Sequence, residues 1–189
     1  MLVLGACLFP EFEHSRTTRM KRSLEVLNDL VRSGIIIDYS IGGAMGATFY
    51  LEPVLTMDLD VFVLFNDDES NLLPLQPIYK ALAERGYLPD EHERECINIE
   101  GTPVQFLPAY NTLLQEALSQ AKCVDYMGTP TKVLSAEHLV AISVQTGRAK
   151  DQLRVLAFME SGILNMDNLR DILVRYELIE RWRLWTASK

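Results

Sequence analysis

Hydrophobic residues along the chain change their spacing several times, and each spacing predicts a different kind of element. The first clear pattern is helical and covers residues 18–33. Its apolar residues recur every three or four positions: Leu24, Leu27, Leu30 and Val31. Gly34 follows where a helix stop belongs. The short apolar run at residues 35–40 then predicts a strand.

Between residues 41 and 134 the pattern predicts short helices and strands that alternate. Gly101 lies between two apolar runs and marks the turn of a hairpin. The expected elements are a helix at 42–50, a strand at 58–65, a helix at 75–86, strands at 92–99 and 103–108, a helix at 111–122, and short strands at 124–127 and 132–134.

From Ser135 onward the pattern becomes helical. Ser135 is a residue type that caps a helix N-terminus, and Gly147 and Gly162 lie at predicted helix ends. The expected helices are 136–147, 149–161, 166–177 and 178–186. We therefore predict an α+β fold, in which residues 20–134 form a core with a small mixed sheet flanked by helices. Residues 135–189 form a C-terminal helical part packed on that core.

Residues 1–19 are expected to be an N-terminal extension, and Met20 is an alternative start for the native chain. The apolar N-terminus is short and has no basic residues before it, so no signal peptide is expected. No apolar run reaches the roughly 18 residues needed to span a bilayer. The three cysteines are scattered, without the spacing of a metal site or a disulfide framework. These features together favour a cytoplasmic protein.

The charge of the chain narrows the classes of partner. The formal net charge is −8, whereas proteins that bind nucleic acids broadly usually carry a basic patch. Nucleic acid is therefore not indicated as a partner, although a local basic site is compatible with this charge. An apolar content of 48% is ordinary for a globular protein.

Asp58 and Asp60 are the strongest candidate site. At positions i and i+2 of a strand their side chains point to the same face, while Leu59, Val61 and Val63 point into a core. Two neighbouring carboxylates repel each other unless a cation lies between them, and Mg²⁺ or Mn²⁺ takes hard oxygen ligands of this kind. The alternative is a solvated strand end, because a lone pair of this spacing is common.

Gly42 and Gly43 precede the pair and begin a predicted short helix. Glycines allow a ligand to approach the backbone closely, and free N–H groups at a helix start suit a phosphate. With Thr56 and the segment Asp58-Leu59-Asp60-Val61, this arrangement resembles the nucleotidyltransferase (polymerase beta-like) superfamily. Within it, the chain is most similar to small bacterial proteins related to abortive-infection and toxin–antitoxin nucleotidyltransferases.

The resemblance implies a Mg²⁺-dependent transfer of a nucleoside monophosphate from a nucleoside triphosphate to a hydroxyl acceptor. The acceptor, whether protein, RNA or small molecule, stays open. Thr56 is implied to lie near the nucleotide. The segment Gly147-Arg148-Ala149-Lys150-Asp151 resembles a second family element, in which Arg148 and Lys150 would steady the triphosphate. The alternative for these residues is a structural helix cap with ion pairs.

The chain departs from the family pattern at three positions. Gln105 occupies the place of a third carboxylate in Val104-Gln105-Phe106-Leu107, and a neutral amide is a poor base. Glu100 either substitutes for it or is an exposed hairpin residue. Val54 stands where relatives carry an arginine, and Ser143 where they carry a lysine. If Gln105 faces Asp58 and Asp60, a Gln105→Asp change is expected to strengthen metal binding.

These departures support an alternative function, namely a catalytically degenerate nucleotidyltransferase-fold protein that binds a nucleotide or a partner. An antitoxin partner or a homo-oligomer is compatible with the sequence. His138 is expected to be a packed or surface histidine, and Trp182 and Trp185 to belong to a core or an oligomer contact.

Overall fold

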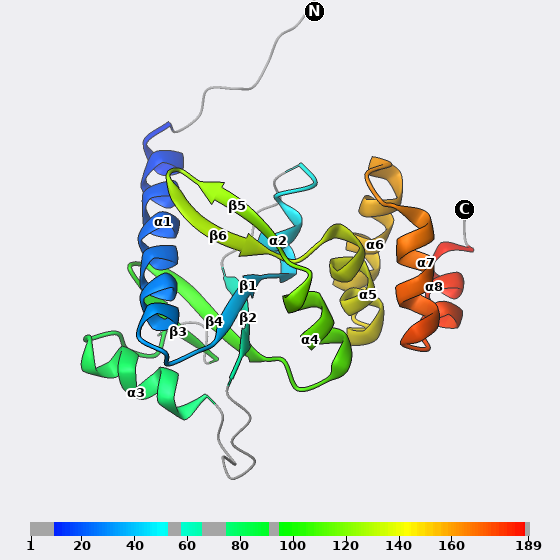
Figure 1. Ribbon diagram of the computed structural model, residues 1–189. Coiled ribbons are helices and arrows are strands. Elements are labelled where there is room, and N and C mark those ends of the chain that lie inside the picture. Colours follow the sequence, from blue (N-terminus) through cyan, green and yellow to red (C-terminus); the bar gives the residue numbers. More distant parts are fainter. Residues whose placement is uncertain (1–9, 53–57, 66–74, 91–94, 188–189) are drawn as a thin grey trace, which may run out of the picture.

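The structure is a computed structural model that describes residues 10–52, 58–65, 75–90 and 95–187 (Figure 1). The elements in chain order are α1 (Pro10–Arg32), β1 (Asp38–Ile41), α2 (Gly43–Ala47), β2 (Leu59–Leu64), α3 (Gln76–Glu84), β3 (Cys96–Ile99), β4 (Thr102–Pro108), α4 (Thr112–Ser119), β5 (Lys122–Tyr126), β6 (Thr129–Val133), α5 (Ala136–Thr146), α6 (Ala149–Ser161), α7 (Met166–Arg175) and α8 (Ile179–Thr186).

The strands form one mixed sheet in the order β3-β4-β2-β1-β6-β5. β4 pairs with β2 in parallel and β1 pairs with β6 in parallel, whereas the β3–β4, β1–β2 and β5–β6 pairs are antiparallel. Two hairpins therefore form the edges, and the strand that carries Asp60 lies near the middle. The expected mixed sheet and both expected hairpins are confirmed.

The two faces of the sheet bury different hydrophobic clusters. α1 and α3 cover one face, where Leu59, Val61 and Val63 of β2 are fully buried. The opposite face carries Phe62 and packs against α2, α4 and the C-terminal helices. Alternation along β2 thus sends its hydrophobic residues to both faces and places Asp60 on the side of the C-terminal helices.

The C-terminal helices lie together at one side of the molecule, away from α1 and α3 (Figure 1). Ser135 caps α5 by accepting the backbone N–H of His138. Gly147 and Gly162 end α5 and α6 in the left-handed conformation, with φ of 79° and 70°. The predicted caps and stops of these helices are confirmed.

Some boundaries differ from the expectation. α1 begins at Pro10 and passes through Met20 without a break, because charged and polar residues before the apolar stripe continue the helix. α2 is shorter than expected and has five residues. None of the helices in the described ranges combines the length and the apolar character that a bilayer span requires.

Candidate functional site

A cleft of about 220 Å³ lies between the sheet and the C-terminal helices. Its walls come from α2, β2, β4, α4, α5 and α6, and from the loop after β4. The lining residues are Gly43, Asp60, Phe62, Gln105, Leu107, Pro108, Tyr110, Leu114, Leu139, Ile142, Ser143, Gln145, Thr146, Arg148, Asp151 and Arg154. The fold therefore brings Gly43, Asp60, Gln105 and Arg148 together, although the sequence separates the first from the last by about a hundred residues.

Asp60 is the acidic centre of the cleft. Burial raises the pKa of its carboxyl group, and the negative charge of Asp58 raises it further. The positive charges of Arg154, Lys150 and Arg148 act in the opposite direction. Asp58, which immediately precedes β2, and the cations Arg148, Lys150 and Arg154 are thus close enough to Asp60 for their charges to act on its carboxylate.

The turn into α2 fits closely around Asp60. Gly43 has a φ of 56°, and a Cβ atom there would lie 1.6 Å from Oδ2 of Asp60. The preceding Gly42 donates its N–H to the carbonyl oxygen of Asp60 at 2.9 Å. A Cβ on Gly42 would meet the ring of Phe62 at 2.3 Å. Both glycines are needed for the close approach of this turn to β2.

The cationic side of the cleft is built around a buried carboxylate. Asp151 is only 1% exposed. Its carboxylate accepts hydrogen bonds from Nε of Arg148 at 2.7 Å and from Nη1 of Arg154 at 3.1 Å. Its hydrogen bond raises the pKa of Arg148, so this guanidinium stays charged. Asp151 also accepts the backbone N–H of Arg148 and caps α6. The structural alternative is therefore correct for Asp151, while both arginines still line the cleft.

Arg154 was missed by the sequence interpretation, and Lys150 lies differently from Arg148. Arg154 follows Asp151 by three residues, so both lie on one face of α6, and that spacing is the signal that could have identified it. Lys150 lines a neighbouring pocket between α2 and α6, which it shares with Arg154. Its charge nevertheless acts on Asp60.

Gln105 lies beside Asp60, because the two residues are partners in the parallel β2–β4 register. Side chains of register partners share a face of the sheet, and both residues line the cleft. Glu100 lies in the β3–β4 turn, where it accepts the hydroxyl of Tyr87 at 2.9 Å and pairs with Arg22 at 3.7 Å. This position agrees with the interpretation of Glu100 as a hairpin residue.

The remaining positions of the family pattern are Ser143, Thr56 and Val54. Ser143 lines the cleft, where a hydroxyl takes the place of the family's lysine. Thr56 and Val54 lie outside the described residues. The expectations for these two residues stay predictions.

Asp58 and Asp60 fit a hard divalent cation. Their mutual repulsion is the electrostatic condition that a cation relieves, and the Asp60 carboxylate lies directly against Gly43, in the space that a Cβ would fill. No cluster of three or more His, Cys, Asp or Glu residues with metal-binding geometry occurs within the described ranges. A cation here would therefore need further oxygen ligands, which phosphates and water supply.

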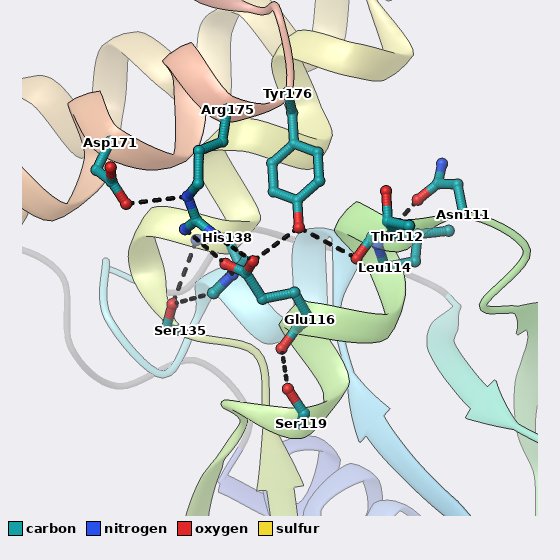
Figure 2. Close-up of polar contacts among 10 residues, drawn as sticks. All are labelled: Asn111, Thr112, Leu114, Glu116, Ser119, Ser135, His138, Asp171, Arg175 and Tyr176. Atoms are coloured by element: carbon teal, nitrogen blue, oxygen red, sulfur yellow. Dashed lines mark hydrogen bonds and ion pairs between the residues drawn. The ribbon is translucent and has the colours of Figure 1, made fainter.

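A polar network joins α4, α5 and α7 (Figure 2). The Glu116 carboxylate accepts hydrogen bonds from Nη1 and Nη2 of Arg175, at 2.5 and 2.9 Å, and from the hydroxyl of Tyr176 at 2.7 Å. It also accepts a hydrogen bond from Nε2 of His138, which is fully buried, at 3.1 Å. Nδ1 of His138 lies 2.8 Å from the hydroxyl of Ser135. The network residues do not line the described cleft, so His138 is a packed structural histidine, as expected.

Replacing Asp60 with asparagine is expected to stabilise the protein in the absence of ligand. The folded state raises the pKa of Asp60 above its ordinary value of 3.8, so ionised Asp60 destabilises the fold at neutral pH. The contribution of Asp60 to the free energy of unfolding therefore decreases as the pH rises from 3.8 through the raised pKa. Thermal unfolding at pH 7 without ligand should give a higher Tm for Asp60→Asn than for wild type. A lower Tm would contradict the prediction.

The fold is similar to that of nucleotidyltransferase-like structures, although the sequence matches no protein-family model and no curated protein. An antigenic nucleotidyltransferase-like protein from Paracoccidioides brasiliensis superposes with a TM-score of 0.53 at 14% identity, covering 88% of this chain and 93% of that one. The solution structure of the antibiotic-resistance factor ANT(2'')-Ia gives a TM-score of 0.51 at 14% identity, covering 88% and 96%. ANT(2")-Ia in complex with adenylyl-2"-tobramycin gives 0.51 at 13% identity, covering 89% and 99%. The chain therefore has a nucleotidyltransferase-like fold.

Proposed function

We propose that this protein transfers a nucleoside monophosphate from a nucleoside triphosphate to a hydroxyl acceptor, with Mg²⁺ or Mn²⁺ as cofactor. One observation carries the proposal. A single cleft contains the carboxylate of Asp60, which the charge of Asp58 repels, the close glycine turn at Gly43, and two arginines, Arg148 and Arg154. This combination suits a metal-bound triphosphate, and the nucleotidyltransferase-like fold supports the same reaction.

In the proposed mechanism, each side of the cleft has its own task. Arg148 and Arg154 bind the non-bridging oxygens of the phosphates, and Asp151 holds both guanidinium groups in place. Because Gly43 has no side chain, the Asp60 carboxylate keeps its place against the turn into α2, from which it would meet the cation. A cation held by Asp58 and Asp60 would neutralise charge on the departing pyrophosphate. The acceptor hydroxyl oxygen attacks the α-phosphorus and releases its proton to water, and the bond from that phosphorus to the leaving pyrophosphate breaks.

The cleft also has apolar lining residues, which suit a flat or ring-shaped group. Leu107, Leu114 and Ile142 are among them, and Tyr110, which lines the cleft as well, is 78% exposed. The related fold of ANT(2")-Ia holds an adenylylated aminoglycoside. A small polyhydroxyl compound is therefore one acceptor class to test for this chain. A protein side chain or an RNA end, in a toxin–antitoxin or phage-defence setting, is another.

We place the protein in the cytoplasm, where its free cysteines would stay reduced.

Ligand-dependent thermal unfolding tests the proposal. Wild type with Mg²⁺ and the preferred triphosphate at about 100 times Kd should gain about 2.7 kcal/mol, because only the folded state binds the ligand. For a chain of this length, that gain corresponds to a rise in Tm of roughly 5–10 °C. The Asp58→Ala/Asp60→Ala variant should fold and show no rise.

The outcomes separate the candidate functions. A rise in Tm together with pyrophosphate release, across a panel of tobramycin, tRNA and purified protein acceptors, supports the enzyme. A rise without release across that panel favours the alternative, a nucleotide-binding module, for which Gln105 and Ser143 are the supporting observations. If no triphosphate raises the Tm of wild type, both nucleotide functions are wrong.

A further inference from the structure

Gln105 has a carboxylate partner that comes from the neighbouring strand. Glu95 immediately precedes β3, and β3 pairs with β4 so that Cys96 lies opposite Gln105. Nε2 of Gln105 donates to Oε2 of Glu95 at 2.6 Å. On its other side, Gln105 is the register partner of Asp60. Gln105 therefore contacts Glu95 on one side and lies beside Asp60 on the other.

This contact determines which way the amide of Gln105 points. An ionised carboxylate only accepts hydrogen bonds, so the NH₂ group of Gln105 must face Glu95. The carbonyl oxygen Oε1 lies on the other branch of the amide and points away from Glu95. Gln105 lines the cleft beside Asp60, and its oxygen is thus available to a group in the cleft. Without Glu95, the amide could turn its donor side to the same place.

We propose that Glu95 and Gln105 act as a pair that replaces a single carboxylate beside Asp60. Gln105 supplies a neutral oxygen ligand, and Glu95 supplies the negative charge and fixes the direction of the amide. Glu95 is then a positioning residue for the metal–nucleotide site. The inference rests on the proposed function, because the bound group is the divalent cation with its nucleotide. Hydrogen bonds that orient a ligand of this kind typically contribute about 10- to 100-fold in metal affinity.

The pairing reverses the expectation for Gln105→Asp. With Glu95 in place, the new carboxylate at position 105 would meet an existing carboxylate that now lies 2.6 Å from the amide. The repulsion between the two would oppose any gain in metal binding. The gain should appear only when Glu95 is neutral, as in Glu95→Gln/Gln105→Asp. The two positions are therefore expected to be strongly coupled.

A double-mutant cycle on metal binding tests the pair and needs no acceptor. The affinity of Mn²⁺ is measured by titration in the presence of each α,β-methylene nucleoside triphosphate, which cannot be cleaved at the α-phosphorus. Glu95→Gln should weaken Mn²⁺ binding about 10-fold. Gln105→Asp should not strengthen it, whereas the double variant should bind at least as tightly as wild type. Glu100→Gln is the matched control, because it removes the same charge from the same hairpin and should leave the affinity unchanged.

Three results would contradict the inference, and they can be told apart. Equal Mn²⁺ affinity in Glu95→Gln and wild type overturns the role of Glu95. A tighter Gln105→Asp variant with Glu95 intact overturns the coupling. If wild type binds no Mn²⁺–nucleotide complex while its Tm without ligand shows a folded protein, the proposed function fails, and the inference fails with it. Unfolding scans without ligand check that every variant is folded.

Discussion

A Gly43→Ala variant is expected to fold but to lose its response to Mg²⁺ and nucleotide. The new Cβ would lie 1.6 Å from Oδ2 and 2.9 Å from Cβ of Asp60, so the Asp60 side chain must turn away. Rotation of the side chain relieves the contacts with Oδ2 and Cγ, whereas the contact with Cβ requires a small shift of the turn itself. The displaced carboxylate can no longer face the cation together with Asp58. The rise in Tm with ligand should therefore disappear, and transfer activity should fall by about 10- to 100-fold, as for loss of a metal ligand's orientation.

Gly34→Ala is the matched control for this prediction. Gly34 also has a positive φ, of 73°, but a Cβ there would have nothing within 4 Å. Both variants should lose about 1–2 kcal/mol of stability through the left-handed backbone alone. Only Gly43→Ala should lose the ligand response. A Gly43→Ala protein that responds to Mg²⁺ and nucleotide like wild type would show that the turn does not shape the site.

A Glu116→Ala variant is expected to be markedly less stable than wild type. His138 is fully buried, and the change removes the acceptor of its Nε2 proton. A buried donor without a partner costs about 1–3 kcal/mol. Arg175 and Tyr176 lose their shared acceptor as well (Figure 2). For a chain of this length, the loss corresponds to a fall in Tm of roughly 3–10 °C. Glu180→Ala removes one exposed ion pair with Arg183 and should change stability by less than about 0.5 kcal/mol.

The same network predicts how stability depends on pH. Partial burial raises the pKa of Glu116, but hydrogen bonds from Arg175, Tyr176 and His138 outweigh it and lower the pKa to about 2. The stabilisation by Glu116 is therefore complete above its ordinary value of 4.5, and is lost as pH falls from 4.5 toward about 2. Burial lowers the pKa of His138 below 6.5. The negative charges of Glu116 and Glu137 act to raise this pKa, and the positive charge of Arg175 acts to lower it further. Stability should thus begin to fall once pH drops below 6.5.

Urea unfolding between pH 8 and pH 3 measures both effects. Wild type should lose stability below pH 6.5 and again below pH 4.5. Glu116→Ala should keep the loss that belongs to His138 and lack much of the loss below pH 4.5. Identical pH profiles for the two proteins would mean that Glu116 does not carry the acid-sensitive stabilisation.

Local spacing in the sequence predicted most of the elements and a large share of the site. The helical stripe of α1, the two hairpins and the capped C-terminal helices follow from periods of two and 3.6 residues and from turn residues, which act over short distances. Gly43 and Asp60 were singled out from local spacing as well, and Arg148 from the family resemblance; all three line the cleft. The boundary of α1 was less predictable, because polar residues continue a helix without any apolar stripe.

The tertiary structure decided which distant residues meet. Glu95 reaches Gln105 only because β3 pairs with β4 in a particular register, and Arg154 reaches the cleft only because α6 packs against α5. Glu116 and Arg175 are 59 residues apart in the chain and meet through the packing of α4, α5 and α7. The sequence by itself determined the elements, the acidic pair and the glycine turn, since these depend on neighbouring residues. Contacts across strands and helices depend on register and packing, so only the folded chain shows that position 105 has a carboxylate partner.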